Sequence, residues 1–112
     1  MMFITLDQAK AQMRVTHDED DEQIEEMIEA ASATIYDYLK SAAAAFVDSS
    51  LEVDEDAVPA TVVMACKITV ADWYKNREGQ RDNAVPAEFG YGYSMPAAAI
   101  ALLYPLRVPT LA

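Results

Sequence analysis

Residues 58–79, VPATVVMACKITVADWYKNREG, decide the fold of this chain. Proline suits the first turn of a helix because its missing N–H has no partner there, and glycine ends a helix in the left-handed conformation. Pro59 and Gly79 therefore predict one helix of about six turns. Only three of residues 60–71 are polar, namely Thr61, Lys67 and Thr69. This is too few for a solvated face, so we expect a core helix that other segments cover on several sides.

The size and composition indicate one globular domain spanning residues 1–112. The chain is 53% hydrophobic and 24% charged, and its three glycines argue against a β-sandwich or barrel. Its longest apolar stretch, 95–106, contains two prolines and is shorter than the roughly 20 residues needed to cross a bilayer, so no membrane partner is expected. Cys66 is the only cysteine and, on the apolar helix, is predicted to be a small buried hydrophobe.

Two helices are predicted before the core helix. Thr5 and Gln8 form a capping-box pattern, which predicts a short helix to about Met13. Apolar residues then recur at spacings of three and four from Ile24 to Leu39, behind an acidic run that suits the positive end of a helix dipole. This pattern predicts a long amphipathic helix with one acidic face outward.

The remaining segments complete an all-α prediction. The alanine run 41–45 has the propensity to extend the second helix, whereas the serines and acids of 46–56 indicate a loop. Residues 80–94 read as a long aromatic loop, and Met95-Pro96 opens a short helix through residues 97–104 that Pro105 stops. We therefore expect a small helical bundle of about four helices, two long and two short, with an extended tail at about 106–112.

The net charge of −11 is concentrated in the first half of the chain. Residues 1–56 hold fifteen acids and three bases, a balance of −12, while residues 57–112 hold four acids and five bases, a balance of +1. Because DNA binding depends on lysine and arginine neutralising phosphates, sequence-specific DNA reading is not expected. Solubility alone is an equally acceptable explanation of the charge.

The acidic residues do not form a convincing metal site. A calcium-loop template places acids at its positions 1, 3, 5 and 12, which here are Asp18, Asp20, Glu22 and Glu29. Its sixth position requires glycine for a sharp turn, and here it is Gln23. His17 is the only histidine, without a nucleophile arranged beside it, so neither a triad nor a zinc site is predicted. We predict no catalytic, cofactor or metal residues.

Residues 25–29, EEMIE, leave one enzymatic alternative open. They resemble the EExxE motif of helical, magnesium-dependent nucleotide pyrophosphohydrolases, in which carboxylates on one helix hold the metal. That family needs a second acidic pair on a later helix, and the only candidate here is Glu52 with Glu55, in a predicted loop. An exposed acidic face is the preferred interpretation. A small acidic regulatory or antitoxin-like protein that binds a basic partner is a third, weaker hypothesis.

Three segments in order resemble the head-tail connector (adaptor) proteins of long-tailed phages. They are ITLDQAK at 4–10, ADWYKNRE at 71–78 and, after Met95-Pro96, YPLRV at 104–108. The resemblance spans nearly the whole chain. It implies an all-α, non-catalytic protein without cofactors that assembles as a ring beneath the portal and extends the DNA channel. It also implies a place in the virion neck after assembly in the host cytoplasm, and contact with a downstream head-completion or stopper protein.

The resemblance and the sequence together give two sets of candidate residues. The expected subunit or partner contacts are Asn76, Arg77, Glu78, Phe89, Tyr91, Tyr93 and Arg107. The expected lining of a channel, through which DNA passes without specific binding, is Glu22, Glu25, Glu26 and Glu29. Two alternatives stay open, because Arg77 could merely complement the dipole of its own helix and the glutamates could equally face the outside of a ring.

Overall fold

The computed structural model describes residues 1–75 and 95–106. Its elements in chain order are α1 (Leu6–Met13), α2 (Asp21–Leu39), the 3-10 helix η1 (Lys40–Ala45), α3 (Ala60–Lys75), α4 (Ala97–Leu103) and the 3-10 helix η3 (Tyr104–Leu106). No strand occurs in the described ranges, where Val47 and Val53 form an isolated antiparallel bridge. The predicted all-α bundle of two long and two short helices is confirmed.

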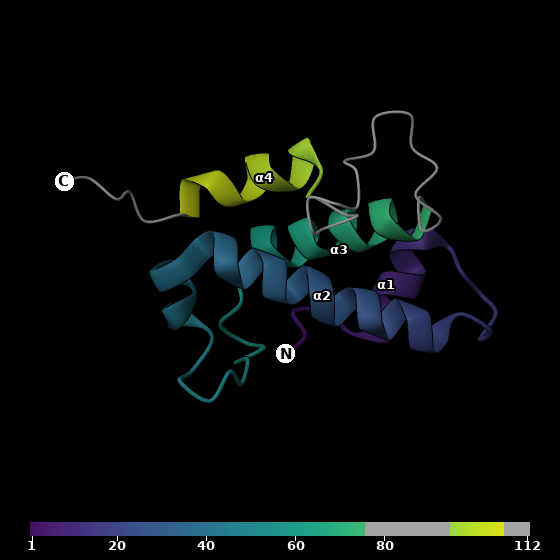
Figure 1. Cartoon of the computed structure of the whole chain (residues 1–112), viewed down its shortest axis with the longest axis horizontal. Coiled ribbons are helices and arrows are strands. Elements are labelled where there is room, and N and C mark those ends of the chain that lie inside the picture. Colours follow the sequence, from purple (N-terminus) through teal and green to yellow (C-terminus); the bar gives the residue numbers. More distant parts are fainter. Residues whose placement is uncertain (76–94, 107–112) are drawn as a thin grey trace, which may run out of the picture.

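Helix α3 is the element on which the others pack. It contacts α1, α2 and α4, and Figure 1 shows it running between α2 and α4. Its buried residues are Val62, Ala65, Cys66, Thr69, Val70 and Trp73. The prediction of a central helix with Cys66 buried is confirmed.

The start of α3 differs from the sequence prediction. The pattern predicts Pro59 in the first turn of the helix, whereas the helix begins at Ala60. The carbonyl oxygen of Pro59 accepts hydrogen bonds from the amides of Val62 at 3.0 Å and Val63 at 3.1 Å. Pro59 therefore stands just before the first helical residue, where its missing N–H costs nothing. The predicted end at Gly79 and the aromatic loop of 80–94 lie outside the described residues.

Helix α1 begins with the capping box that the sequence predicts. The hydroxyl oxygen of Thr5 accepts the Gln8 amide at 3.1 Å, and the Gln8 side-chain oxygen accepts the Thr5 amide at 2.8 Å. At its other end Arg14 adopts a left-handed conformation with φ 58°, and its amide bonds back to the carbonyl of Ala11. Two free amides at the start and one carbonyl at the end are thus satisfied.

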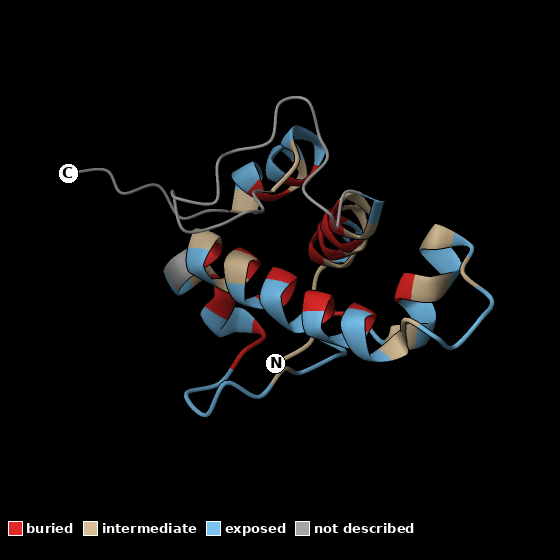
Figure 2. Ribbon diagram, turned by 45° about the vertical axis from the view of Figure 1, so that its right-hand side comes forward, coloured by how far each residue is buried: buried red, intermediate tan, exposed pale blue. Residues whose placement is uncertain are grey.

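Helix α2 is amphipathic, as predicted. Figure 2 shows its buried residues facing α3 and its exposed residues facing away. The buried residues are Ile24, Met27, Ile28, Ala31, Ser32, Ile35 and Leu39. The alanine run after Lys40 does not continue the α-helix but tightens into η1. This tighter turn buries Ala43 and leads to Phe46, whose ring meets that of Phe3 edge-on with centroids 5.6 Å apart.

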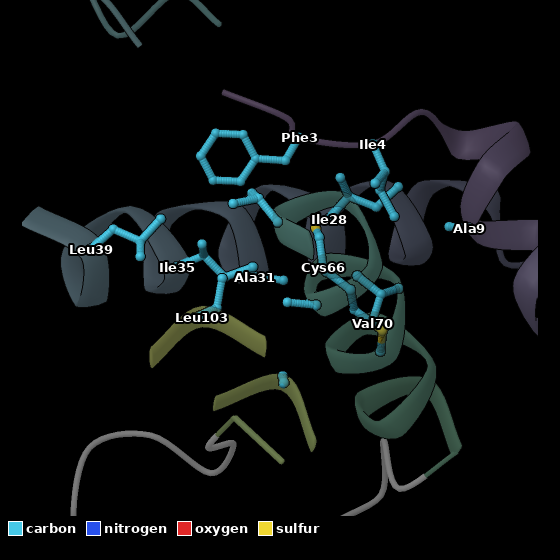
Figure 3. Close-up of a cluster of buried hydrophobic side chains, with 14 of the residues drawn as sticks. Phe3, Ile4, Ala9, Ile28, Ala31, Ile35, Leu39, Cys66, Val70 and Leu103 are labelled. Carbon is cyan, nitrogen blue, oxygen red and sulfur yellow. The ribbon is translucent and has the colours of Figure 1, made fainter. Parts of the chain in front are cut away.

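The core joins α2, α3, α4 and the N-terminal segment. In Figure 3 the side chains of Ile28, Ala31 and Ile35 lie toward Cys66 and Leu103. Two polar residues, Ser32 and Thr69, are fully buried. The hydroxyl of Thr69 donates to the Ala65 carbonyl at 2.8 Å, and Ser32 accepts from the Phe3 amide. No buried side-chain polar atom of the described residues lacks a hydrogen bond.

The connection between η1 and α3 is an ordered loop with an exposed tip. The side-chain oxygen of Asp48 accepts the amides of Ser50 at 2.8 Å and Glu52 at 3.0 Å, which closes a turn. Leu51 at this tip has φ 63° and is half exposed. The acids of residues 54–56 also belong to this loop, and the first turn of α3 contains no acidic residue. They lie within the loop that the sequence predicts for residues 46–56.

The C-terminal end is more compact than the sequence predicts. Helix α4 ends at Leu103, one residue before the predicted Tyr104, and η3 then includes Pro105 and Leu106. Leu106 was a predicted tail residue, but it is partly buried and packs against the core. Residues 107–112 lie outside the described part. Among the helices that the structure describes, none is long and apolar enough to cross a membrane.

Candidate functional site

All seven expected contact residues lie outside the part of the chain that the structure describes. They are Asn76, Arg77, Glu78, Phe89, Tyr91, Tyr93 and Arg107. Lys75, the last described residue of α3, is exposed. The expectation that this helix end contacts another subunit stays a prediction.

The structure does place the four expected channel residues together on one surface. Glu22, Glu25, Glu26 and Glu29 are all exposed on the first half of α2, on the side turned away from the core (Figure 2). Residues three and four apart on a helix are neighbours, with Cβ atoms about 5 to 6 Å apart. We call these four carboxylates the acidic face of α2.

This face carries more negative charge than the helix needs. Glu22 lies in the first turn, where a carboxylate is stabilised by the helix dipole. Glu25, Glu26 and Glu29 lie beyond that turn, and like charges at these spacings cost about 0.2 to 0.5 kcal/mol per pair. Within residues 1–75 and 95–106 none of the four forms an ion pair. Stabilisation by the helix dipole therefore accounts for Glu22 but not for the other three carboxylates of the acidic face.

The aspartates at the start of α2 and just before it have structural partners instead. The Lys10 amine lies 2.8 Å from a carboxylate oxygen of Asp21 and 2.9 Å from one of Asp18. The hydrogen bonds to Asp21 and Asp18 raise the pKa of Lys10, and the hydrogen bond from Lys10 lowers the pKa of Asp18. The phenol of Tyr74 donates to Asp20 at 2.5 Å. These contacts fasten the α1–α2 connection to α1 and α3.

The arrangement does not assemble the acids into a metal centre. No group of three or more His, Cys, Asp or Glu side chains in the described residues could hold a metal ion. Asp18 and Asp20 of the calcium template bond to Lys10 and Tyr74, and His17 is exposed. The second acidic pair of the hydrolase hypothesis, Glu52 and Glu55, lies in the loop after η1 (Figure 1), past the opposite end of α2 from the EExxE residues.

A hollow beside the acidic face is a feature that the sequence reasoning missed. It measures about 220 Å³ and lies where α2 meets the last turns of α3. Its lining residues are Gln23, Glu26, Met27, Ala30 and Trp73. Trp73 lies far along the sequence from the four α2 residues, so no local sequence signal indicates the hollow. Another hollow, of about 390 Å³, is lined by the end of η1 and the loop that follows it.

A second missed feature is the outer surface of α4. Ile100 and Tyr104 are exposed, and Tyr104 is the most exposed of the large hydrophobic residues in the described part. Residues 95–106 contain no charged side chain, in a chain of net charge −11. The absence of charge in this segment was the available signal, but the sequence reasoning used it only to weigh a membrane span.

Comparison with known proteins agrees with the order of segments in the chain. A family model described as phage gp6-like head-tail connector protein matches residues 3–107. The match includes all four helices, the acidic face and the hollow. Comparisons with curated proteins and with solved structures find no significant match. The chain therefore belongs to the phage gp6-like head-tail connector family.

Proposed function

We propose that this protein forms a ring in the phage neck, between the portal and the tail-proximal connector proteins, and extends the DNA channel. Its family is that of the structural proteins that connect head and tail. The proposal adds self-assembly, the portal and a downstream stopper protein as partners, and assembly in the host cytoplasm. It assigns no catalysis and no cofactor.

The acidic face of α2 is the observation that carries the channel part of this proposal. Four exposed carboxylates without ion-pair partners in the described part are costly for the helix itself. They suit a channel wall, because a surface without cations cannot hold DNA by counterion release. DNA would then pass without being retained.

Ring formation is tested by measuring the mass of the protein. Native mass spectrometry and electron microscopy of the purified protein, alone and mixed with its portal, should show a closed ring. A protein that stays monomeric in both conditions would contradict the proposal. A dimer or tetramer that hydrolyses nucleoside triphosphates with magnesium would favour the hydrolase hypothesis instead.

The DNA part needs a test that separates passage from folding. Reversing Glu25, Glu26 and Glu29 to lysine should impair DNA delivery by assembled particles more than it impairs folding. The matched control reverses the three exposed loop acids Glu52, Glu55 and Asp56, which changes the net charge equally away from α2. Equal infectivity of the two triple mutants would count against a channel wall on α2. Retardation of duplex DNA by the unmutated protein in a gel at about 150 mM salt would also count against it.

The subunit contacts at the end of the core helix remain part of this proposal. Arg77 follows α3 by two residues, and a guanidinium can pair bidentately with a carboxylate of a neighbour. We expect Arg77→Ala to abolish rings and to leave the monomer folded, whereas Lys75→Ala should leave rings intact. Normal rings from Arg77→Ala would show that this side chain only complements the helix dipole.

A further inference from the structure

Tyr104 projects from the C-terminal end of α4. It is 69% exposed, the highest value among the large hydrophobic residues that the structure describes. The neighbouring exposed residues of α4 and η3 are alanines, Ile100 and Pro105, so these two helices place no charge beside the phenol. An exposed aromatic residue on an uncharged surface is typical of a protein contact, because tyrosine combines a large apolar ring with a hydrogen-bonding tip.

The hollow between α2 and α3 suits such a side chain. Met27 and Trp73 supply apolar surface, while Gln23 and Glu26 supply polar atoms. A cavity of about 150 Å³ can hold a benzene molecule, so the 220 Å³ of this hollow has room for a phenol ring. The sulfur of Met27 and the ring of Trp73 are favourable neighbours for a phenol ring. The carboxylate of Glu26 can accept a hydrogen bond from the phenol hydroxyl.

The side chain of Tyr104, which we call the knob, and the hollow lie at opposite ends of the molecule. The last turn of α4 is at one end in Figure 1, whereas the first half of α2 and the last turns of α3 are at the other. Tyr104 therefore cannot fill the hollow of its own chain. Contact between two different surfaces on successive copies is heterologous, and a heterologous contact closes into a ring when the rotation permits.

Charge also favours this pairing over the alternatives. Two copies that met through their acidic faces would bring like charges together, which costs free energy. The uncharged surface of residues 95–106 can approach α2 without that repulsion.

We propose that Tyr104 of one copy inserts between α2 and α3 of the next copy, in the hollow lined by Met27, Ala30 and Trp73. The contact rests on the proposed ring and identifies one pair of surfaces that builds it. The ring of the phenol packs on Met27 and Trp73, and its hydroxyl donates to Glu26.

The first test measures self-association. Tyr104→Ala should weaken it about 30-fold or more per contact, as for other buried aromatic anchors, while Tyr104→Phe should retain most of it. Leu51→Asn is the matched control, because it removes an exposed apolar side chain elsewhere on the surface. Asparagine also tolerates the positive φ of position 51. Rings of Tyr104→Ala with wild-type stability would overturn the contact and leave the proposed ring standing.

Mixing two defective variants gives a sharper result. Ala30→Phe fills the hollow and keeps the knob, whereas Tyr104→Ala keeps the hollow and lacks the knob. At a protein concentration where each variant alone is monomeric, their mixture should form a dimer with one intact contact and no larger assembly. Larger assemblies, or no association in the mixture while the wild type assembles, would contradict the proposal. A wild type that fails to assemble even with its portal would overturn the ring and this contact together.

Cross-linking tests the same contact in assembled particles. In a Cys66→Ala background, Ala30→Cys with Tyr104→Cys should give a ladder of disulfide-linked chains on oxidation. The control pair, Leu51→Cys with Tyr104→Cys, should give none. A ladder from the control and not from the first pair would show that successive copies meet through the loop after η1 instead.

Discussion

The hydroxyl oxygen of Ser32 lies 3.7 Å from the sulfur of Cys66 and accepts the amide of Phe3 at 2.9 Å. One buried oxygen thus joins α2, α3 and the N-terminal segment. Ser32 and Cys66 are fully buried, so water cannot replace a lost partner there. This relationship makes the N-terminal residues part of the folded core.

Removing that oxygen should release the N-terminal segment. We expect Ser32→Ala to destabilise the protein by about 1 to 3 kcal/mol, because the buried amide of Phe3 loses its acceptor. Urea denaturation gives the stability, and hydrogen exchange of the Phe3 amide reports the local opening. Ser41→Ala, at an exposed serine, is the control and should change neither. An unchanged exchange rate in Ser32→Ala would contradict this role.

Cys66 should make the protein sensitive to alkaline pH. Burial raises the pKa of its thiol to about 11, against an ordinary value of 9.0, and the hydrogen bond with Ser32 opposes the shift. Between these values the unfolded chain releases the proton and the folded chain keeps it, so stability falls as pH rises. The advantage of wild type over Cys66→Ala should shrink by about 2 kcal/mol from pH 9 to pH 11. A constant difference across this range would refute the prediction.

Trp73 should contribute more to stability than any exposed aromatic residue. Its side chain is buried at the junction of α2 and α3, so Trp73→Ala should cost roughly 3 to 5 kcal/mol. Tyr104→Ala, measured on the monomer, should cost less than about 0.5 kcal/mol because that ring is exposed. Thermal or urea denaturation of both variants makes the comparison. A melting temperature of Trp73→Ala close to wild type would show that the indole is not a core anchor.

The ion pairs of Lys10 should matter at neutral pH and disappear in acid. The folded-state pKa of Asp18 is lowered by its hydrogen bond with Lys10, so this stabilisation is present above the ordinary carboxyl pKa of about 3.9. It is lost as pH falls through the lowered value. Lys10→Met should therefore be less stable than wild type at pH 7 and approach it at low pH. Lys67→Met, without an ion pair in the described residues, should show no such convergence.

Much of the fold follows from local sequence signals. The capping box at Thr5, the apolar spacing of α2 and the near absence of polar residues in α3 each have a direct physical reading, and all three are confirmed. The errors fall where local signals compete with packing. The alanine run after Lys40 has high helix propensity, yet a tighter turn forms there and leads Phe46 to Phe3. Propensity alone could not reveal that tertiary contact.

The candidate surfaces were only half predictable. Spacing on one helix was enough to group Glu22, Glu25, Glu26 and Glu29, since residues three and four apart share a face. The hollow beside them depends on Trp73, which is distant in sequence from Met27 and Ala30, so no local pattern could indicate it. The exposure of Tyr104 likewise depends on how α4 lies on α3. Such features require the tertiary arrangement.

The central position of α3 also has a consequence for synthesis. The N-terminal part of a chain leaves the ribosome first, but a domain folds as a unit. Here α1 and α2 bury their apolar faces largely against a helix that begins at Ala60. The nascent chain therefore exposes Ile24, Ile28 and Ile35 until residue 75 has emerged. The acidic residues of α2 give this exposed segment a negative charge, and repulsion between such segments keeps them soluble until α3 has emerged. We infer that the charge of α2 protects the chain before it folds as well as shaping its surface afterwards.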